Sequence, residues 1–201
     1  MRTFIMTAAM MAAVAAPMQA QDAFDTRAIR GEGTVMAVSM IAGDWLVNNA
    51  FTQEMYGVAV ERGMAGAHFA WGNVLAAGDP HRAMSGGVDF AVAVPRVPLD
   101  LTVGAGFAQA QVAEDVTLRE FGAPIHLSSS TVLVFDSFWV HPLLAIGAIV
   151  HRTEFDETTT GVKQYAATGL EIGRGPASLR AHLEHNISAP QQANLALRFR
   201  F

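Results

Sequence analysis

The sequence contains no cysteine, a single lysine (Lys163) and few aromatic residues, which make up 8% of the chain. Without cysteine the chain has no disulfide framework, so a core, a closed barrel or surrounding lipid must stabilise it. Long apolar runs are also absent after the first twenty residues. Segment 63–78 is interrupted by His68 and glycines, and segment 137–151 by His141 and Pro142. Neither segment therefore has the roughly 20 apolar residues of a transmembrane helix.

Positive charge is scarce as well. The chain has 13 basic and 18 acidic residues, which gives a formal net charge of −5 at pH 7. A nucleic-acid partner requires a basic surface, so this balance argues against one. Nevertheless 51% of the residues are hydrophobic. Because no long apolar helix contains these residues, they must be distributed over short alternating strands. Membrane barrels and soluble secreted β-proteins share this pattern.

The amino-terminus has the three parts of a secretory signal peptide. Arg2 supplies a positive start, the uncharged segment 4–16 follows, and Ala20 precedes the first acid, Asp22. An anchoring helix is the weaker interpretation, because the apolar run is shorter than a membrane span. We therefore predict a signal peptide over 1–20, cleaved near Ala20, and one domain over 21–201.

The carboxy-terminal segment 193–201 alternates strictly between apolar and polar side chains. Side chains of a strand point to opposite faces at successive residues, so this segment has one apolar and one polar face. The chain then ends on an aromatic residue. The apolar face carries Ala193, Leu195, Leu197, Phe199 and Phe201, and the other face carries Asn194, Ala196, Arg198 and Arg200.

Similar alternation recurs along the chain. It is clear near 84–94, 99–108 and 177–187, and weaker near 33–42, 54–62, 65–74, 119–130, 139–154 and 162–173. With the terminal strand, these segments predict ten strands, although a count of eight stays open. Links at 62–63, 95–98 and 174–176 are short, whereas those at 44–52, 75–81 and 155–161 look longer and more polar. Short turns on one side and longer loops on the other are typical of bacterial barrels, with the short turns periplasmic.

The polar faces of these strands are built mostly from small residues. A soluble barrel would point its large aliphatic residues inward and its charges outward. Here the apolar face suits lipid, and the small polar face suits the interior of a narrow barrel. Lipid also forbids an open sheet edge, so the sheet must close. The predicted fold is all-β: a closed antiparallel up-and-down transmembrane β-barrel of eight to ten strands, with ten favoured.

The leader, the alternating strands and segment 193–201 together resemble the small outer-membrane β-barrel superfamily, which includes the transmembrane domain of outer-membrane protein A and the opacity-type barrels. The resemblance implies a bacterial outer-membrane location. It also implies that Leu195, Leu197, Phe199 and Phe201 form the signal read by the barrel assembly machinery. Interfacial aromatic residues are expected from Trp45, Tyr56, Trp71, Trp139 and Tyr165, which would form a sparse girdle.

Charged residues on the polar faces are predicted to form a network inside the barrel. An unpaired buried charge is costly, so opposite charges on neighbouring strands should meet. A metal site at His182, Glu184 and His185 is disfavoured, because His185 points to the opposite face of the strand. No cofactor is expected. The predicted network comprises Asp89, Asp100, Glu171, Arg180, His182, Glu184, Arg198 and Arg200.

These patterns predict a structural or surface-interaction protein, or at most a narrow pore, and not an enzyme. Its expected partners are outer-membrane lipids, the barrel assembly machinery and an external partner that contacts the loops at 44–52, 75–81 and 155–161. One alternative is a lipid A acyl hydrolase using His185 and Ser188, although their spacing places them on opposite faces of a strand. A second alternative is a soluble periplasmic β-barrel that binds a small apolar ligand.

Overall fold

The computed structural model describes residues 33–44, 52–76, 79–113, 116–154, 158–186 and 189–201. Ten long strands and one two-residue strand make up this part of the chain, which contains no helix long and apolar enough to cross a membrane. The predicted signal peptide lies outside the described residues. The strands are β1 (Thr34–Asp44), β2 (Thr52–Arg62), β3 (Ala65–Ala76), β4 (Asp79–Ala93), β5 (Leu99–Ala113), β6 (Val116–Ser129), β7 (Leu133–Val134), β8 (Trp139–Glu154), β9 (Thr158–Arg174), β10 (Ala177–Asn186) and β11 (Ala189–Arg200).

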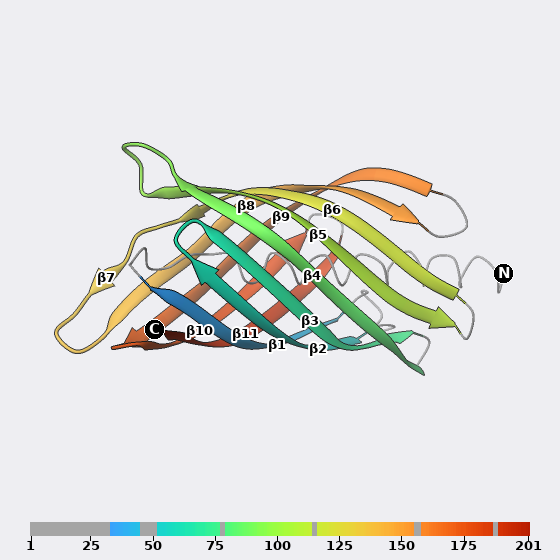
Figure 1. Cartoon of the computed structure of the whole chain (residues 1–201), viewed down its shortest axis with the longest axis horizontal. Helices are drawn as coiled ribbons and strands as arrows, with labels where there is room; N and C mark the ends of the chain where they lie inside the picture. The colour runs from blue at the N-terminus through green and yellow to red at the C-terminus, as the bar shows by residue number, and fades with distance from the viewer. Residues whose placement is uncertain (1–32, 45–51, 77–78, 114–115, 155–157, 187–188) are drawn as a thin grey trace.

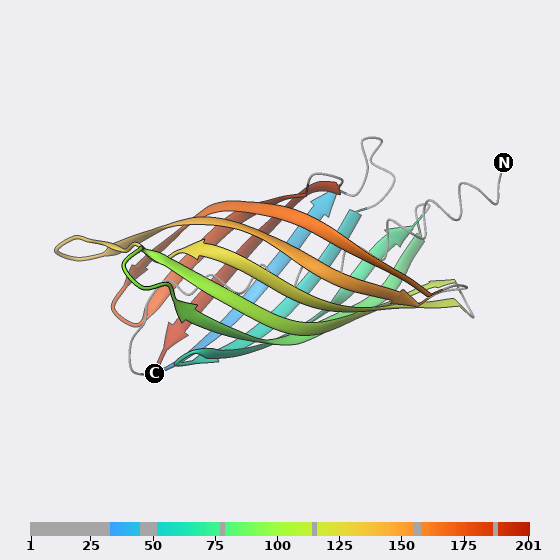
Figure 2. The same ribbon diagram turned by 90° about the horizontal axis from the view of Figure 1, so that it is seen from above.

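The sheet is antiparallel and closed. Each long strand pairs with the next along the chain, β1 pairs with β11, and β6 pairs with β8, so the ten long strands form a complete ring. Figure 1 and Figure 2 show these strands running obliquely around a barrel. The predicted fold is thus confirmed, with ten strands and not eight. β7 pairs only with the start of β8 and projects beyond the wall.

The two ends of the barrel carry different links between the strands. The turn end carries the links 63–64, 94–98, 130–138 and 175–176 together with Phe201, and the opposite end carries the remaining links. The expected loops at 75–81 and 155–161 are shorter than predicted. Ala76 pairs with Asp79 and Glu154 pairs with Thr158, so the strands continue almost to the tips of their hairpins. Polar residues there remain in strands because their backbone is still paired.

The outer surface carries an apolar belt. On the outward face of β2, Tyr56, Val58 and Val60 are exposed between Glu54 and Arg62, and the outward faces of the other long strands are also mainly apolar. At about 3.3 Å per residue and a tilt of about 40°, the eight steps from Glu54 to Arg62 span about 20 Å along the axis. The ten steps from Gln164 to Arg174 on β9 span about 25 Å. These heights match the apolar band of transmembrane barrels.

The orientation of the faces agrees with the alternation in the sequence. Leu101, Val103, Leu195 and Leu197 are 37%, 46%, 47% and 41% exposed on the outer surface, whereas Arg198 is 5% exposed. The expected aromatic girdle is partly wrong. Tyr56 and Trp71 face outward as paired neighbours on β2 and β3, but Trp139 and Tyr165 follow the inward-facing phase of their strands, and Trp45 lies outside the described residues.

A charge introduced on the belt tests which face meets lipid. Leu195→Arg places a guanidinium near the middle of the belt and should destabilise the barrel by about 2–4 kcal/mol. Asn73→Arg, at the edge of the belt, should cost at most about 1 kcal/mol. Urea unfolding in phospholipid vesicles measures both. Equal costs for the two variants would contradict an outward lipid-facing surface.

Candidate functional site in the barrel interior

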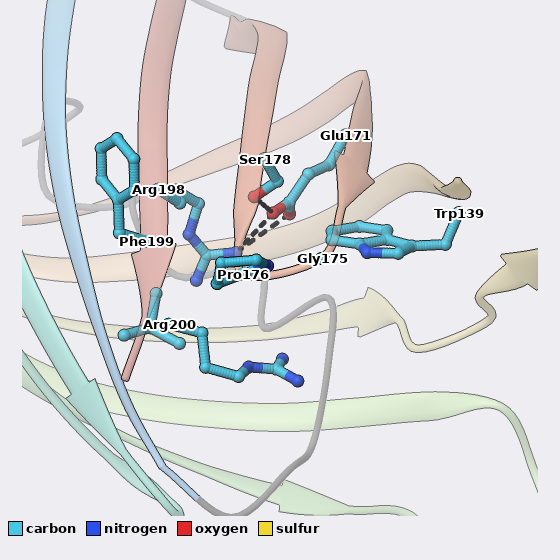
Figure 3. A pocket seen from close by; sticks show the side chains of 9 residues that line it. Trp139, Glu171, Gly175, Pro176, Ser178, Arg198, Phe199 and Arg200 are labelled. Carbon is cyan, nitrogen blue, oxygen red and sulfur yellow. Dashed lines mark hydrogen bonds and ion pairs between the residues drawn. The ribbon is translucent and has the colours of Figure 1, made fainter. Parts of the chain in front are cut away.

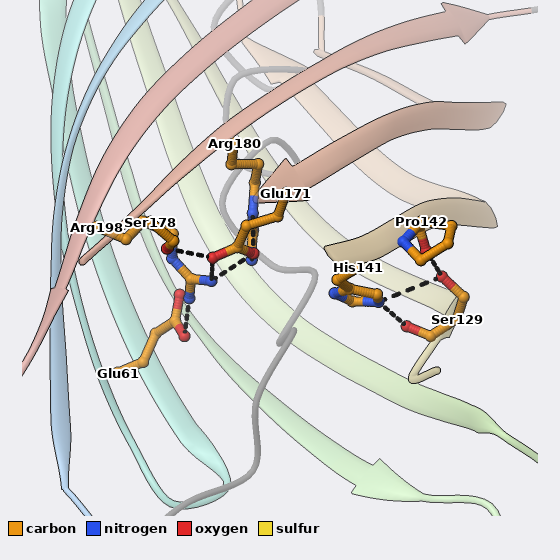
Figure 4. A network of polar contacts seen from close by, with 8 residues as sticks. All are labelled: Glu61, Ser129, His141, Pro142, Glu171, Ser178, Arg180 and Arg198. Carbon is orange, nitrogen blue, oxygen red and sulfur yellow. Dashed lines mark hydrogen bonds and ion pairs between the residues drawn. The ribbon is translucent and has the colours of Figure 1, made fainter. Parts of the chain in front are cut away.

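The interior at the turn end is organised around one carboxylate, Glu171 of β9. Arg180 lies directly opposite Glu171 on β10, and its Nε and Nη2 donate to Oε2 of Glu171 at 3.0 and 2.8 Å. Arg198 of β11 donates from Nη1 to both oxygens at 3.0 and 2.9 Å, and the Ser178 hydroxyl donates to Oε1 at 2.6 Å. Glu171 therefore joins three neighbouring strands (Figure 4).

Arg198 extends this network across the join between the first and last strands. Its Nη2 donates to Glu61 of β2, although β1 lies between β11 and β2 in the sheet. On β1, Ala37 pairs with Arg198 and Val35 pairs with Glu61, so the contact passes over two short inward-phase side chains of the strand between. The network contains two carboxylates and two guanidiniums, and its charges balance. Such mutual pairing is what buried ions require.

The turn end leaves little open space around this network. A cavity of about 20 Å³ lies there, lined by residues that include Trp139, Glu171, Pro176 and Arg198 (Figure 3). A volume of that size holds about one water molecule. The side chains that line this cavity therefore leave room for about one water molecule beside the network.

A second polar cluster connects β6 and β8 at the point where their regular pairing ends. His141 Nε2 donates to the carbonyl oxygen of Ser129 at 2.9 Å. The Ser129 hydroxyl donates to the Pro142 carbonyl and accepts the Leu144 N–H at 3.1 Å. Pro142 has no N–H for the ladder, and Ser129 thus supplies hydrogen bonds at a point where regular strand pairing is interrupted (Figure 4).

Further along the barrel, three pairs of polar groups lie inside. The Tyr165 hydroxyl and His126 Nδ1 are 2.8 Å apart. Gly147 lies between them in the sheet, and a Cβ at that position would be 2.7 Å from the Tyr165 hydroxyl, so only glycine permits this contact. His182 Nε2 lies 3.6 Å from Glu184 Oε1, and His151 Nδ1 lies 3.1 Å from Glu120 Oε1.

Apolar residues fill part of the interior toward the opposite end. Ile41, Met55 and Val74 on β1, β2 and β3 have no exposed surface, and Ile149 packs with Tyr165 and Ala108. The interior is thus less uniformly small and polar than the sequence indicated. Medium-sized apolar side chains at the inward positions occupy space that a wide aqueous channel would need.

The residues predicted to form one network are found in different parts of the barrel. Glu171, Arg180 and Arg198 contact one another, and His182 and Glu184 lie next to each other at the following inward positions of β10. Asp89 and Asp100 lie elsewhere, on β4 and β5, where Asp89 is half-buried and Asp100 is buried opposite Ser128. Arg200 is half-buried and lines the cavity at the turn end.

Several interior residues were not in the predicted set. Glu61 follows Met55, Gly57 and Ala59 in the inward phase of β2, a signal that was present in the sequence but weak. His141 lies in the predicted strand 139–154, but it was not assigned to the network. Among the described residues, no group of His, Asp and Glu side chains could hold a metal ion. The other residues described above that lie outside the predicted set are Glu120, His126, Ser129, His151, Tyr165 and Ser178.

No protein-family profile matches the chain, and no curated protein matches its sequence. Among solved structures, it is similar to the translocator domain of the autotransporter NalP from Neisseria meningitidis, at 12% identity over 94% of this chain and 93% of that one, with a TM-score of 0.49. It is similar to the β domain of the Bordetella autotransporter BrkA at 12% identity, over 85% of this chain and 100% of that one, with a TM-score of 0.49. The N-terminal β-barrel domain of Pseudomonas aeruginosa OprF has 14% identity, over 85% and 99%, and a TM-score of 0.33. At such low identities, role and partners must be argued from this chain's own residues.

The shared carboxylate should be the most sensitive charged site in the barrel. Glu171→Gln leaves the buried Arg180 without its counter-ion and should cost about 3–5 kcal/mol of unfolding free energy. Glu61→Gln should cost less, because Arg198 keeps Glu171 as a partner. Glu154→Gln is the control, since its ion pair with Arg152 is exposed and worth at most about 1 kcal/mol. Urea unfolding in vesicles should show losses of stability that decrease from Glu171→Gln to Glu61→Gln to Glu154→Gln. A Glu171→Gln variant as stable as the parent would contradict the role of the shared carboxylate.

Proposed function

We propose that this protein is an integral β-barrel of the bacterial outer membrane with a largely filled interior, which serves a structural or surface-interaction role. The observation that carries the proposal is the apolar belt around a sheet without a free edge. In water, that belt would expose a continuous apolar surface, which soluble monomers rarely do. In lipid, the same belt is solvated, and the closed ring satisfies the backbone.

The filled interior supports a role other than bulk transport. Glu171, Arg180 and Arg198 occupy the inside at the turn end, and Ile41 and Met55 occupy it toward the opposite end. A permeant molecule would have to displace paired charges or apolar side chains. A narrow pore is the alternative role. Acids exceed arginines among the described inward-facing residues, so such a pore would favour cations; the acids are Glu61, Asp89, Asp100, Glu120, Glu171 and Glu184.

The proposal includes assembly by the barrel assembly machinery. Leu195, Leu197 and Phe199 on β11, with Phe201 directly after it, form an exposed apolar row on the strand that closes the ring against β1. External partners would meet the end of the barrel opposite the turns. This end carries the short hairpins at 77–78 and 155–157 and the longer link at 45–51.

Two alternatives have less support. For an acyl hydrolase, Glu184 is buried inside the barrel while His185 is exposed on the outer surface, so the two cannot act together from one face. Ser188, the proposed nucleophile, lies outside the described residues. A soluble carrier would need its apolar side chains around an internal ligand, whereas Leu101, Val103, Leu195 and Leu197 point away from the interior.

Two measurements on purified protein test this function. Unboiled protein extracted from outer membranes should migrate faster than boiled protein in detergent gels, as a closed barrel that resists detergent does. In planar bilayers the same preparation should produce no discrete current steps. Regular current steps with cation selectivity would favour the narrow pore over the structural role. Recovery of the protein from the aqueous periplasm would contradict the membrane location.

A further inference from the structure

The turn end of the barrel carries three exposed arginines just beyond the apolar belt. Arg62 and Arg174 are the last residues of β2 and β9, and Arg96 lies in the link between β4 and β5. Arg62 is the next outward-facing residue after Val60, and Arg174 is the next after Ile172. These side chains therefore lie at the level where the hydrocarbon ends and lipid headgroups begin.

The backbone conformation of Arg96 is a second observation, separate from charge, that favours a functional role for its side chain. Gly63 and Gly175 adopt positive φ in their turns, at 59° and 57°, a conformation that glycine adopts readily. The corresponding link between β4 and β5 contains Arg96 at a φ of 69°, the sole non-glycine with positive φ in the described chain. A side chain there is disfavoured, and residues held in such conformations cluster at functional positions.

The basic excess is confined to the turn end. The one exposed acid in its links is Asp136, and Glu61 turns inside to bind Arg198. At the opposite end, Arg82, Arg119 and Arg152 are accompanied by Glu54, Asp79 and Glu154. The sequence of the links there adds further acids at 114–115 and 156–157. The two ends thus differ in sign as well as in position.

Exposed apolar residues accompany the arginines at the turn end. Met64 and Val97 lie next to them in the turns, at 55% and 46% exposure. The projecting link 130–138 adds Leu133, Val134 and a stacked pair, Phe135 and Phe138, whose ring centroids are 4.7 Å apart. Basic groups beside exposed apolar side chains are typical of surfaces that lie in a membrane interface.

We propose that the turn end binds the headgroups of anionic phospholipids, with Arg62, Arg96 and Arg174 on the phosphates. The inference rests on the membrane location proposed above and on the expectation, drawn from the sequence, that the links at 62–63, 95–98 and 174–176 face the periplasm. Each guanidinium offers paired N–H donors that match phosphate oxygens. Attraction of a basic residue to an anionic surface corresponds to about fivefold in binding. Three such residues should enrich anionic lipid around this end severalfold over zwitterionic lipid.

The test compares lipids retained by the mature chain. The barrel is reconstituted in nanodiscs of equal phosphatidylcholine and phosphatidylglycerol, and bound lipids are counted by native mass spectrometry after release into detergent. We expect a severalfold preference for phosphatidylglycerol. In the triple variant Arg62→Gln, Arg96→Gln, Arg174→Gln, this preference should decrease until phosphatidylglycerol and phosphatidylcholine are retained about equally. A matched triple variant at the opposite end, Arg82→Gln, Arg119→Gln, Arg152→Gln, should keep the preference.

A single variant separates lipid binding from folding. Arg96→Gly removes the charge and relieves the disfavoured backbone, so it should raise resistance to urea while lowering the preference for phosphatidylglycerol. Absence of a preference in the parent protein, or equal loss in both triple variants, overturns the proposal. Failure of the parent to insert into nanodiscs or to migrate faster unboiled would instead refute the membrane barrel itself.

Discussion

Hydrocarbon offers the peptide group no hydrogen-bond partner, and each unpaired group there costs several kcal/mol. The whole architecture follows from that constraint. For the proposed membrane location, β1 must pair with β11 and β6 with β8, and the closed ring leaves every strand one exposed, mainly apolar face and one face toward a narrow interior. Charged residues can lie only inside or at the two rims. Glu171, Arg180 and Arg198 are inside, and they are stable there because they neutralise one another.

Strict alternation made the faces and most strands predictable. A period of two determines which residues share a face, so segments 139–154 and 177–187 matched β8 and β10 to within one residue. The same phase assigned Glu171, Arg180 and Arg198 to the inner face, and opposite charges on adjacent strands were expected to pair, although the pattern did not say which residues would meet. Local pattern and neighbouring strands carry this information directly.

Features that depend on distant strands were not predictable in this way. The contact between Arg198 and Glu61 requires the register of two ladders on either side of β1, which no short segment encodes. Tyr165 meets His126 only because Gly147 separates them on β8. Loop length was overestimated at 75–81 and 155–161, because polar residues and Pro80 indicate a turn even where the paired strands continue almost to the tip of the hairpin.

The ion pair between Arg198 and Glu61 also bears on how the molecule is completed. Arg198 belongs to the last strand and Glu61 to the second, so the two groups are far apart in the chain and meet only when the ring joins. Before that moment they lie near opposite borders of an open sheet, and their attraction strengthens as water leaves the narrowing gap. The pair therefore ties β11 to β2 across β1, so that separating β1 from β11 also requires breaking a buried ion pair.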